Sequence, residues 1–153
     1  MHAVKLLLDW PGLRRQRESV HDNVFWRGAE PLMSVCVPAC GRDVSPLLAA
    51  LSASEQSGLV EFIVHDDGRC GHDVLAHMQA AAGHVPAAVR IVSSREKLDG
   101  MAARGAAAAH ARTSWVMLLD ADAEADAGVI ATYLEAIGKA DGERRAPARA
   151  KAG

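Results

Sequence analysis

From Leu32 onward, short apolar runs alternate with stretches whose apolar residues recur every three or four positions. A run of four to eight apolar residues between turn signals is typical of a buried strand, and the longer spacing is typical of a helix that covers it. The runs predict strands at Leu32–Val37, Leu59–His65, Ala88–Val92 and Trp115–Leu119. The intervening patterns predict helices from Asp43 or Ser45 to Leu51, at Asp73–Ala82, at Asp99–Ala111 and at Ala125–Ile137.

Strands that alternate with helices in this way build βαβ units, so the sequence predicts an α/β fold with a mostly parallel sheet flanked by helices. The strands are continuously apolar, which favours a sheet that helices cover on both faces. The chain has 153 residues, enough for one such domain, and the regular pattern assigns residues 32–140 to it. Ligands bind such sheets beyond the carboxyl ends of the strands, so the loops after each strand should carry the chemistry.

The two ends of the chain lack this pattern. Residues 1–31 mix charged residues with aromatic ones and predict an N-terminal arm, with one short helix around Leu13–Val20. Residues 141–153 are rich in Arg, Ala and Gly and predict a disordered basic tail. No apolar run reaches the roughly 18 residues that a membrane-spanning helix needs.

Composition narrows the function classes. The net charge is −2 and aromatic residues make up 4% of the chain, so neither a basic nucleic-acid surface nor a base-stacking platform is expected. The 3 cysteines are odd in number and sparsely spaced, unlike a secreted disulfide framework. The sequence therefore predicts a cytoplasmic protein without a nucleic-acid partner, and it leaves open an attachment to the inner face of the membrane.

The strongest local signal is Asp120-Ala121-Asp122, directly after the last predicted strand. Two carboxylates one residue apart at a strand end supply hard oxygen ligands, which suit Mg²⁺ or Mn²⁺ and leave metal positions open for substrate phosphates. The alternative interpretation is a helix start, where acidic residues favour the positive end of the helix dipole. These residues alone leave both interpretations open.

Two weaker signals lie upstream. Asp66-Asp67-Gly68 follows the second predicted strand, and by itself it is also a plain turn signal. Gly100–Ala107 lies in the alanine-rich helix before the last strand, where Arg104 could point toward a phosphate. The alternative for this segment is a buried alanine-rich helix with one solvated arginine.

Taken in their order along the chain, the motifs resemble those of the family-two nucleotide-sugar glycosyltransferases, which have the GT-A fold. In that family a first strand reads roughly S-V-x-V-P-x-x-x-R, which Ser34–Arg42 resembles. A second strand ends in D-D-G-S, and Asp66–Arg69 matches it with Arg in place of Ser. A helix with G-x-x-x-A-R-N-x-A is matched in part by Gly100–Ala107, and a strand end L-D-A-D is matched by Leu119–Asp122. The resemblance covers the chain from residue 33 to about residue 138.

The resemblance implies a Rossmann-like nucleotide-binding half that binds a nucleoside-diphosphate sugar, often a UDP-sugar, together with Mg²⁺ or Mn²⁺. It implies that Asp67, with Asp66 beside it, accepts a hydrogen bond from a ring N–H of the base. It also implies that Asp120 lies near the ribose and that Asp122 holds the metal that bridges the diphosphate. Arg104 adds a further positive charge in this arrangement.

The expected nucleotide-binding set also includes Pro38 and Arg42 of the first motif. The chain departs from the family pattern at three positions. Gly105 stands where the family has Asn, Arg69 stands where it has Ser, and Gly100 lies one residue closer to the arginine than usual. These departures fall in the helix motif and in the turn after the second strand.

The leading prediction is glycosyl transfer to an unknown acceptor, assisted by a metal, with inversion at the anomeric carbon. The chain beyond Asp122 is short for an acceptor half, and no catalytic base can be named in it. The alternative is a non-catalytic or truncated nucleotide-sugar-binding module that lacks the acceptor half. An unpaired sheet edge after Trp115–Leu119 then favours a homo-oligomer or a partner chain.

Overall fold

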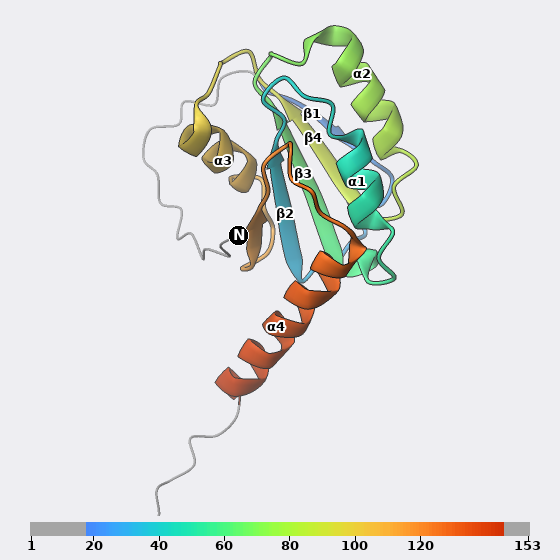
Figure 1. The fold of residues 1–153 in the computed structure, drawn as a ribbon, viewed down its shortest axis with the longest axis vertical. Helices are drawn as coiled ribbons and strands as arrows, with labels where there is room; N and C mark the ends of the chain where they lie inside the picture. Colours follow the sequence, from blue (N-terminus) through green and yellow to red (C-terminus); the bar gives the residue numbers. More distant parts are fainter. Residues whose placement is uncertain (1–17, 146–153) are drawn as a thin grey trace, which may run out of the picture.

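The structure, a computed structural model, describes residues 18–145 (Figure 1). The strands in this range are β1 (Ser19–Asp22), β2 (Met33–Pro38), β3 (Val60–Asp66), β4 (Ala88–Ser93) and β5 (Val116–Leu118). The α-helices are α1 (Ser45–Ser52), α2 (Gly71–Ala82), α3 (Gly100–Ala108) and α4 (Ala127–Arg145), and a 3₁₀ turn, η1, spans Ser57–Leu59. Strand and helix alternate from β2 to α4, as the hydrophobic pattern predicts.

The strands form one five-stranded sheet in the order β1-β4-β3-β2-β5. Strands β2, β3, β4 and β5 run parallel, and β1 pairs with β4 in the antiparallel direction. Figure 1 shows the helices arranged around this sheet. The predicted α/β fold with a mostly parallel sheet is therefore confirmed.

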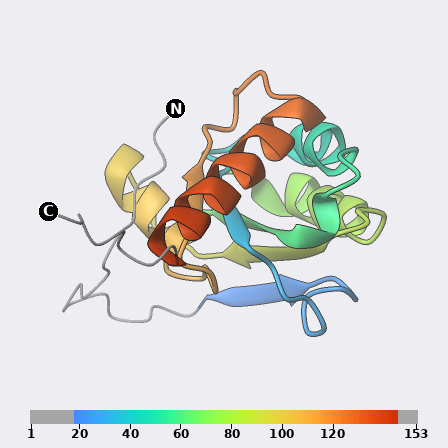
Figure 2. The ribbon, with the colours of Figure 1, turned by 90° about the horizontal axis from the view of Figure 1, so that it is seen from below.

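The sheet separates two hydrophobic clusters. On one face, Val35 and Phe62 of the central strands pack with residues of α1, α2 and α4. On the other face, Cys36 and Ile63 pack with α3, through small residues such as Ala107 that let this helix lie close to the strands. Figures 1 and 2 show these layers from two directions. Both faces of β2 and β3 are covered, so every residue of the two strands is buried, including the polar residues Ser34 and Glu61.

Strand β1 was not predicted from the sequence. Ser19 and Val20 are extended residues of β1, so the expected helix around Leu13–Val20 is wrong at these two positions, and residues 13–17 lie outside the described range. A bidentate ion pair between Asp22 and Arg90 helps to hold β1 against β4, with distances of 2.7 and 2.8 Å. Part of the expected N-terminal arm is therefore a strand of the main sheet.

Helix α4 is longer than the sequence pattern indicates. The apolar periodicity predicts an end at Ile137, but the helix continues to Arg145. The expected disordered tail therefore differs from the structure at residues 141–145, which are helical, and residues 146–153 lie outside the described range. No helix within residues 18–145 is both long and apolar enough to cross a membrane.

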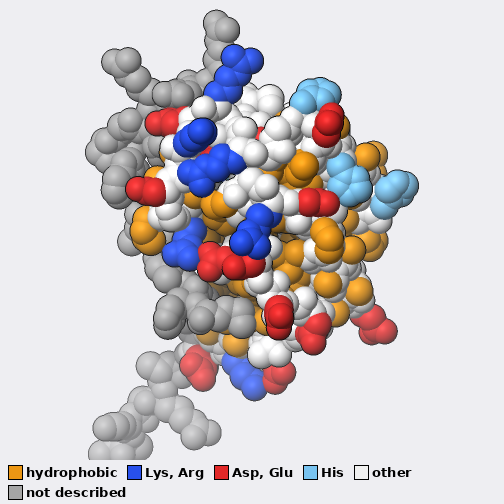
Figure 3. Space-filling model, turned by 45° about the horizontal axis from the view of Figure 1, so that its top comes forward, with side chains coloured by type: hydrophobic (Ala, Val, Ile, Leu, Met, Phe, Trp, Pro, Cys, Tyr) orange, Lys and Arg blue, Asp and Glu red, His pale blue; other side chains and the backbone are white. Residues whose placement is uncertain are grey.

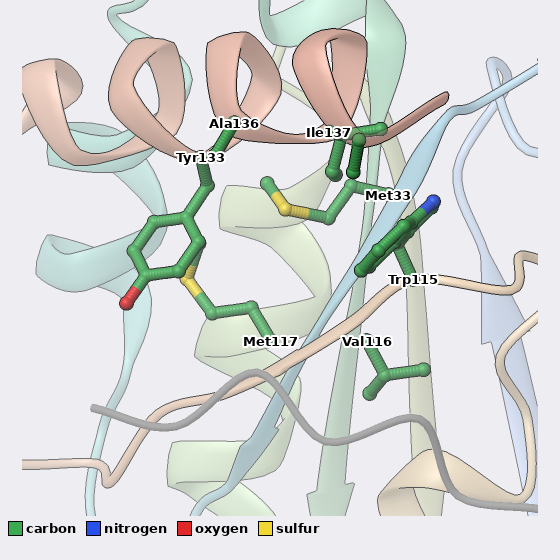
Figure 4. A pocket seen from close by; sticks show the side chains of 8 residues that line it. Met33, Trp115, Val116, Met117, Tyr133, Ala136 and Ile137 are labelled. Atoms are coloured by element: carbon green, nitrogen blue, oxygen red, sulfur yellow. The ribbon is translucent and has the colours of Figure 1, made fainter. Parts of the chain in front are cut away.

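Strand β5 lies at one edge of the sheet, beside an apolar groove. In Figure 4, Tyr133 and Ile137 of α4 face Met33, Met117 and Trp115, which come from β2 and from the β5 region. Nearly all of the side chains that line the groove are apolar. The groove lies on the same face of the sheet as α1 and α2, so it is part of the larger hydrophobic layer.

Candidate functional site

The loops after the parallel strands meet at one edge of the sheet, because parallel strands place all their carboxyl ends on the same side. Strands β2, β3 and β4 end at Pro38, Asp66 and Ser93, and β5 ends just before Leu119 and Asp120. Figure 3 brings this edge forward and shows Lys and Arg side chains gathered next to Asp and Glu side chains. We refer to it as the carboxyl edge.

A polar pocket of about 200 Å³ lies at the carboxyl edge. Three separate segments line it: the loop after β2, the first turns of α3 and the loop after β5. Its lining residues are Pro38, Cys40, Arg42, Gly100, Arg104, Asp120, Ala121 and Asp122. The structure thus brings together five of the residues expected from the sequence, namely Pro38, Arg42, Arg104, Asp120 and Asp122.

Arg104 and Asp120 form an ion pair across this pocket. The Nη2 atom of Arg104 donates to Oδ1 of Asp120 at 2.7 Å, and the side chains are 37% and 60% exposed. The hydrogen bond and the charge of Asp120 hold the pKa of the Arg104 guanidinium above its ordinary value. Arg104 is therefore a permanent cation next to the first carboxylate of the Asp-x-Asp motif.

Asp122, the second carboxylate of that motif, is exposed and has no hydrogen-bond or ion-pair partner among residues 18–145. No group of three or more His, Cys, Asp or Glu side chains in the described part of the chain is arranged to hold a metal ion. The pocket itself offers two carboxylates, which suit a hard divalent cation that completes its shell with phosphate oxygens and water. The residues present therefore fit a metal that binds together with a phosphorylated ligand.

Asp66 is the last residue of β3 and Asp67 begins the turn that follows, and the two carboxylates have different structural roles. Oδ1 of Asp66 accepts hydrogen bonds from the backbone N–H groups of Gly68 at 3.0 Å and Cys70 at 3.2 Å, and Oδ2 accepts from the Ser93 hydroxyl at 2.9 Å. Asp66 thus holds the turn in place. Gly68 has φ +86°, a conformation that favours glycine, and an added Cβ would lie 3.2 Å from a backbone oxygen of the next loop.

Asp67 forms an ion pair with Arg69 and is not among the residues that line the polar pocket. Its side chain is only 2% exposed, and Oδ2 is 3.1 Å from both the Leu98 backbone nitrogen and the Arg69 Nε. Oδ1 accepts a longer bond of 3.3 Å from the Arg69 backbone nitrogen. The carboxylate expected to recognise the base is therefore already hydrogen-bonded, and it is not among the residues that line the pocket.

Arg69, which replaces the serine of the family motif, links two loops of the carboxyl edge. Besides its contact with Asp67, its Nη2 atom donates to the Leu98 carbonyl at 3.0 Å. Gly41 makes room for it: this glycine has φ +83°, and an added Cβ would lie 3.2 Å from the Arg69 Cβ. Sequence reasoning did not find this link, since nothing local to Arg69 indicates that it meets residues some thirty positions away.

Cys40 also lines the pocket, although it was not among the site residues predicted from the sequence. It is exposed and has φ +50°, in the left-handed region that non-glycine residues rarely adopt. The place of Cys40 inside the first motif, between Pro38 and Arg42, is the signal that could have found it. Its thiol is the only sulfur among the side chains that line the pocket.

A parallel α/β sheet with a polar pocket beyond its carboxyl ends is the arrangement in which nucleotide-binding domains hold their ligands. A family comparison makes the assignment more specific. Residues 34–143, more than two thirds of the chain, match the model of glycosyl transferase family 2. The chain therefore belongs to glycosyl transferase family 2. The comparisons with curated proteins and with solved structures found no match.

Proposed function

We propose that the carboxyl edge binds a nucleoside-diphosphate sugar, a UDP-sugar in the first instance, and that the chain transfers the sugar to an acceptor. The observation that carries this proposal is the polar pocket. Three motifs that are far apart in the sequence meet there and supply two arginines and two carboxylates. Family membership supports a nucleotide sugar as the class of ligand.

The diphosphate occupies the polar pocket in this proposal. Arg42 and Arg104 supply positive charge, and an arginine guanidinium can hold phosphate oxygens with two parallel hydrogen bonds. Asp122 holds Mg²⁺ or Mn²⁺, and Asp120 lies by the ribose and the metal. When bound, the metal stabilises the negative charge that grows on the departing nucleoside diphosphate.

The base lies toward the turn after β3. Asp67 accepts from a ring N–H of the base in this proposal, and its engagement by Arg69 and Leu98 means that the base must share or displace one of these partners. Asp66 acts as a positioning residue, because its two oxygens hold the turn that carries Asp67. Pro38, at the end of β2, is part of the wall of the pocket.

The reaction we propose is a single displacement at the anomeric carbon, which inverts its configuration. Such a displacement needs a base near the acceptor hydroxyl, at a hydrogen-bond distance of about 2.6–3.2 Å. Asp120 and Asp122 are the only carboxylates among the residues that line the pocket, and the proposal assigns them to the donor. The proposal therefore concerns the donor site and the type of transfer, with a cytoplasmic location as expected from the sequence.

Calorimetric titration of the 153-residue chain with UDP tests the donor site. We expect UDP to bind more tightly with Mn²⁺ than with a chelator, and Asp122→Asn to remove most of this difference. Asp67→Ala should weaken UDP binding with or without metal, by roughly 1–3 kcal/mol, because a hydrogen bond to a buried carboxylate is lost. Glu135→Gln is the matched control, since Glu135 is an exposed carboxylate paired with Lys139 on α4.

Failure of every nucleoside diphosphate to bind, with and without Mn²⁺, would contradict the proposed site. A donor-turnover assay with Mn²⁺ and a panel of acceptors tests the transfer step separately. We expect sugar transfer that Asp122→Asn abolishes. Nucleotide binding without any transfer or donor hydrolysis would keep the site and reject the catalytic function.

A further inference from the structure

We propose that Arg69 sets the base selectivity of the donor site, because its ion pair with Asp67 weakens the discrimination between uracil and cytosine. The chain then binds UDP and CDP with similar affinity. The inference rests on the proposed function, since it concerns the base end of the same site. It also concerns a feature of this chain's own sequence, because Arg69 stands where the family motif has serine.

The first observation is the engagement of the Asp67 carboxylate. Its Oδ2 atom lies 3.1 Å from the Arg69 Nε and accepts a hydrogen bond of 3.1 Å from the Leu98 backbone nitrogen. Its Oδ1 atom accepts from the Arg69 backbone nitrogen at 3.3 Å. The side chain of Asp67 is 2% exposed, whereas that of Arg69 is 40% exposed. Both carboxylate oxygens are therefore engaged, and an approaching base meets the guanidinium first.

The second observation is that Arg69 is held on several sides. Its Nη2 atom donates to the Leu98 carbonyl at 3.0 Å while its Nε faces Asp67, so one planar guanidinium bridges the turn after β3 and the loop before α3. An added Cβ on Gly41 would lie 3.2 Å from the Arg69 Cβ, so the base of the arginine side chain also packs against the loop after β2. A base that needs Asp67 must disrupt these contacts, and their loss offsets part of its binding free energy.

The two pyrimidines differ in what they offer to these side chains. The N3 atom of uracil carries a hydrogen and donates, whereas the N3 atom of cytosine has a lone pair and accepts. An ionised carboxylate only accepts, so an accessible Asp67 favours uracil and disfavours cytosine. A guanidinium only donates, so Arg69 can bind the carbonyl oxygen at C2 that both bases carry. With Arg69 over Asp67, the site presents the group that serves both bases.

The other contacts of the turn do not depend on the Arg69 side chain. The hydrogen bond from the Leu98 backbone nitrogen holds Asp67 in place, and Asp66 bonds the backbone of the turn through Gly68 and the Ser93 hydroxyl. A serine at position 69 keeps the backbone N–H but is too short to bridge the two loops. Its introduction should therefore free the carboxylate for a base without dismantling the turn.

The experiment is calorimetric titration of the 153-residue chain with UDP and with CDP, both at saturating Mn²⁺. The readout is the ratio of the two dissociation constants. A net hydrogen bond of ordinary strength corresponds to about 5-fold in affinity, so we expect the two nucleotides to lie within about 5-fold of each other in the unmodified chain. In Arg69→Ser we expect the preference for UDP over CDP to rise by at least about 5-fold, because Asp67 becomes free to accept from uracil.

Arg95→Ser is the matched control. Arg95 is an exposed arginine that borders the same turn, since its Cα would lie 3.6 Å from a Cβ added to Gly68. Among residues 18–145, Asp67 has no hydrogen bond or ion pair with it. We expect this variant to leave the ratio unchanged, even if the loss of charge weakens the binding of both nucleotides. The ratio therefore separates base selectivity from general electrostatic attraction.

Two further variants refine the test. Combining Arg69→Ser with Asp67→Asn should return the ratio to near its original value, because an amide can both donate and accept. Arg69→Lys keeps the charge but cannot reproduce the planar fork, so it should give an intermediate ratio. It also serves as the test variant if Arg69→Ser does not fold, which thermal unfolding of each variant verifies.

Three outcomes would overturn the inference. They are a difference of more than about 5-fold between UDP and CDP in the unmodified chain, an unchanged ratio in Arg69→Ser and Arg69→Lys, and an equal rise of the ratio in Arg95→Ser. In each of these cases nucleotides still bind, so the proposed donor site survives. Absence of binding of both nucleotides to the unmodified chain, with and without Mn²⁺, overturns the proposed function together with the inference.

Discussion

Two carboxylate–arginine pairs lie at opposite ends of the same sheet. The distance between the arginine nitrogen and the carboxylate oxygen is similar in both, but the burial of the carboxylate differs. At the carboxyl edge, Asp120 is 60% exposed and meets Arg104 at 2.7 Å. Near the amino end of β3, the Glu61 carboxylate is fully buried and meets the Nε atom of Arg112, whose side chain is 34% exposed, at 2.6 Å. The two arginines are similarly exposed, so the pairs differ in the burial of the carboxylate, which is structural at Glu61 and replaceable at Asp120.

The pair between Glu61 and Arg112 belongs to a network that fixes several segments. Glu61 also accepts from the Arg112 backbone nitrogen at 2.8 Å and from the Ser34 hydroxyl at 2.6 Å. The guanidinium of Arg112 lies 3.8 Å from the centre of the Trp26 ring, and that of Arg90 lies 4.4 Å from it. Trp26 therefore anchors the segment between β1 and β2 on the face of the sheet that α3 covers.

Substitution of Glu61 should have the largest effect on stability. In Glu61→Gln the charge that balances Arg112 is lost while the polar surroundings stay buried, and breaking a buried pair costs about 3–5 kcal/mol. We expect a loss of about 3 kcal/mol in the free energy of unfolding, measured by chemical denaturation. Asp120→Asn is the matched change at the exposed pair, and it should cost less than about 1 kcal/mol. Equal losses in the two variants would remove the distinction between the two ends.

Turn geometry at the carboxyl edge should give the next largest effect. Gly68→Ala places a Cβ 3.2 Å from the Ser94 carbonyl oxygen at φ +86°, and such strain costs about 1–3 kcal/mol. Because the turn carries Asp67, we also expect weaker UDP binding. Gly58→Ala is the control, since nothing lies within 4 Å of its added Cβ. A Gly68→Ala chain as stable as the control and with unchanged UDP affinity would show that the turn tolerates a side chain.

Much of the fold could be predicted because it follows from local patterns. The parallel strands read as apolar runs, and their carboxyl ends identified the loops that line the pocket. Strand β1 could not be predicted, because long-range contacts hold it in place. Asn23, just after β1, is an example: its side chain donates to the carbonyls of Ala82 and Ala87 and accepts from the Val89 backbone nitrogen.

For the candidate site, the individual residues could be predicted from the sequence, but the long-range contacts between them could not. Motif resemblance indicated Arg104, Asp120 and Asp122 one by one, but not that Arg104 and Asp120 bind each other. The engagement of Asp67 also depends on a contact between distant loops, because its Oδ2 accepts a hydrogen bond from the Leu98 backbone nitrogen. Spacing along the chain shows which residues share an edge of the sheet, and only the packed loops decide which of them are already engaged.

A smaller effect is expected from His65, a buried group with no counter-charge bound to it. Its side chain is 2% exposed and its Nδ1 atom has no hydrogen-bond partner among the described residues. Burial lowers its pKa below the ordinary value of 6.5, and the charges of nearby carboxylates, Glu18 first, oppose this shift. The unfolded chain then binds more protons than the folded chain, so stability is full above about pH 6.5 and decreases as the pH falls toward the folded pKa.

The measurement is the free energy of unfolding between pH 7.5 and about pH 5, where the unfolded imidazole becomes protonated. The decrease should amount to about 1.4 kcal/mol for each unit by which burial lowers the pKa. His65→Gln should make the profile flatter, and His72→Gln should not, because His72 is exposed. Identical profiles in the two variants would show that His65 is not the group responsible.

The smallest effect we predict is on thiol reactivity, and it needs no change in stability. Cys40 is exposed in the polar pocket, whereas burial raises the pKa of Cys36 and Cys70 to about 12. Only the thiolate reacts readily, so at pH 8 a thiol reagent should label Cys40 first and the other two mainly upon unfolding. UDP with Mn²⁺ should slow the labelling of Cys40 several-fold by covering the pocket, and Cys40→Ser should remove the fast phase. Fast labelling of Cys36 would show that the sheet interior is open, and unprotected labelling of Cys40 at saturating UDP would place the nucleotide outside this pocket.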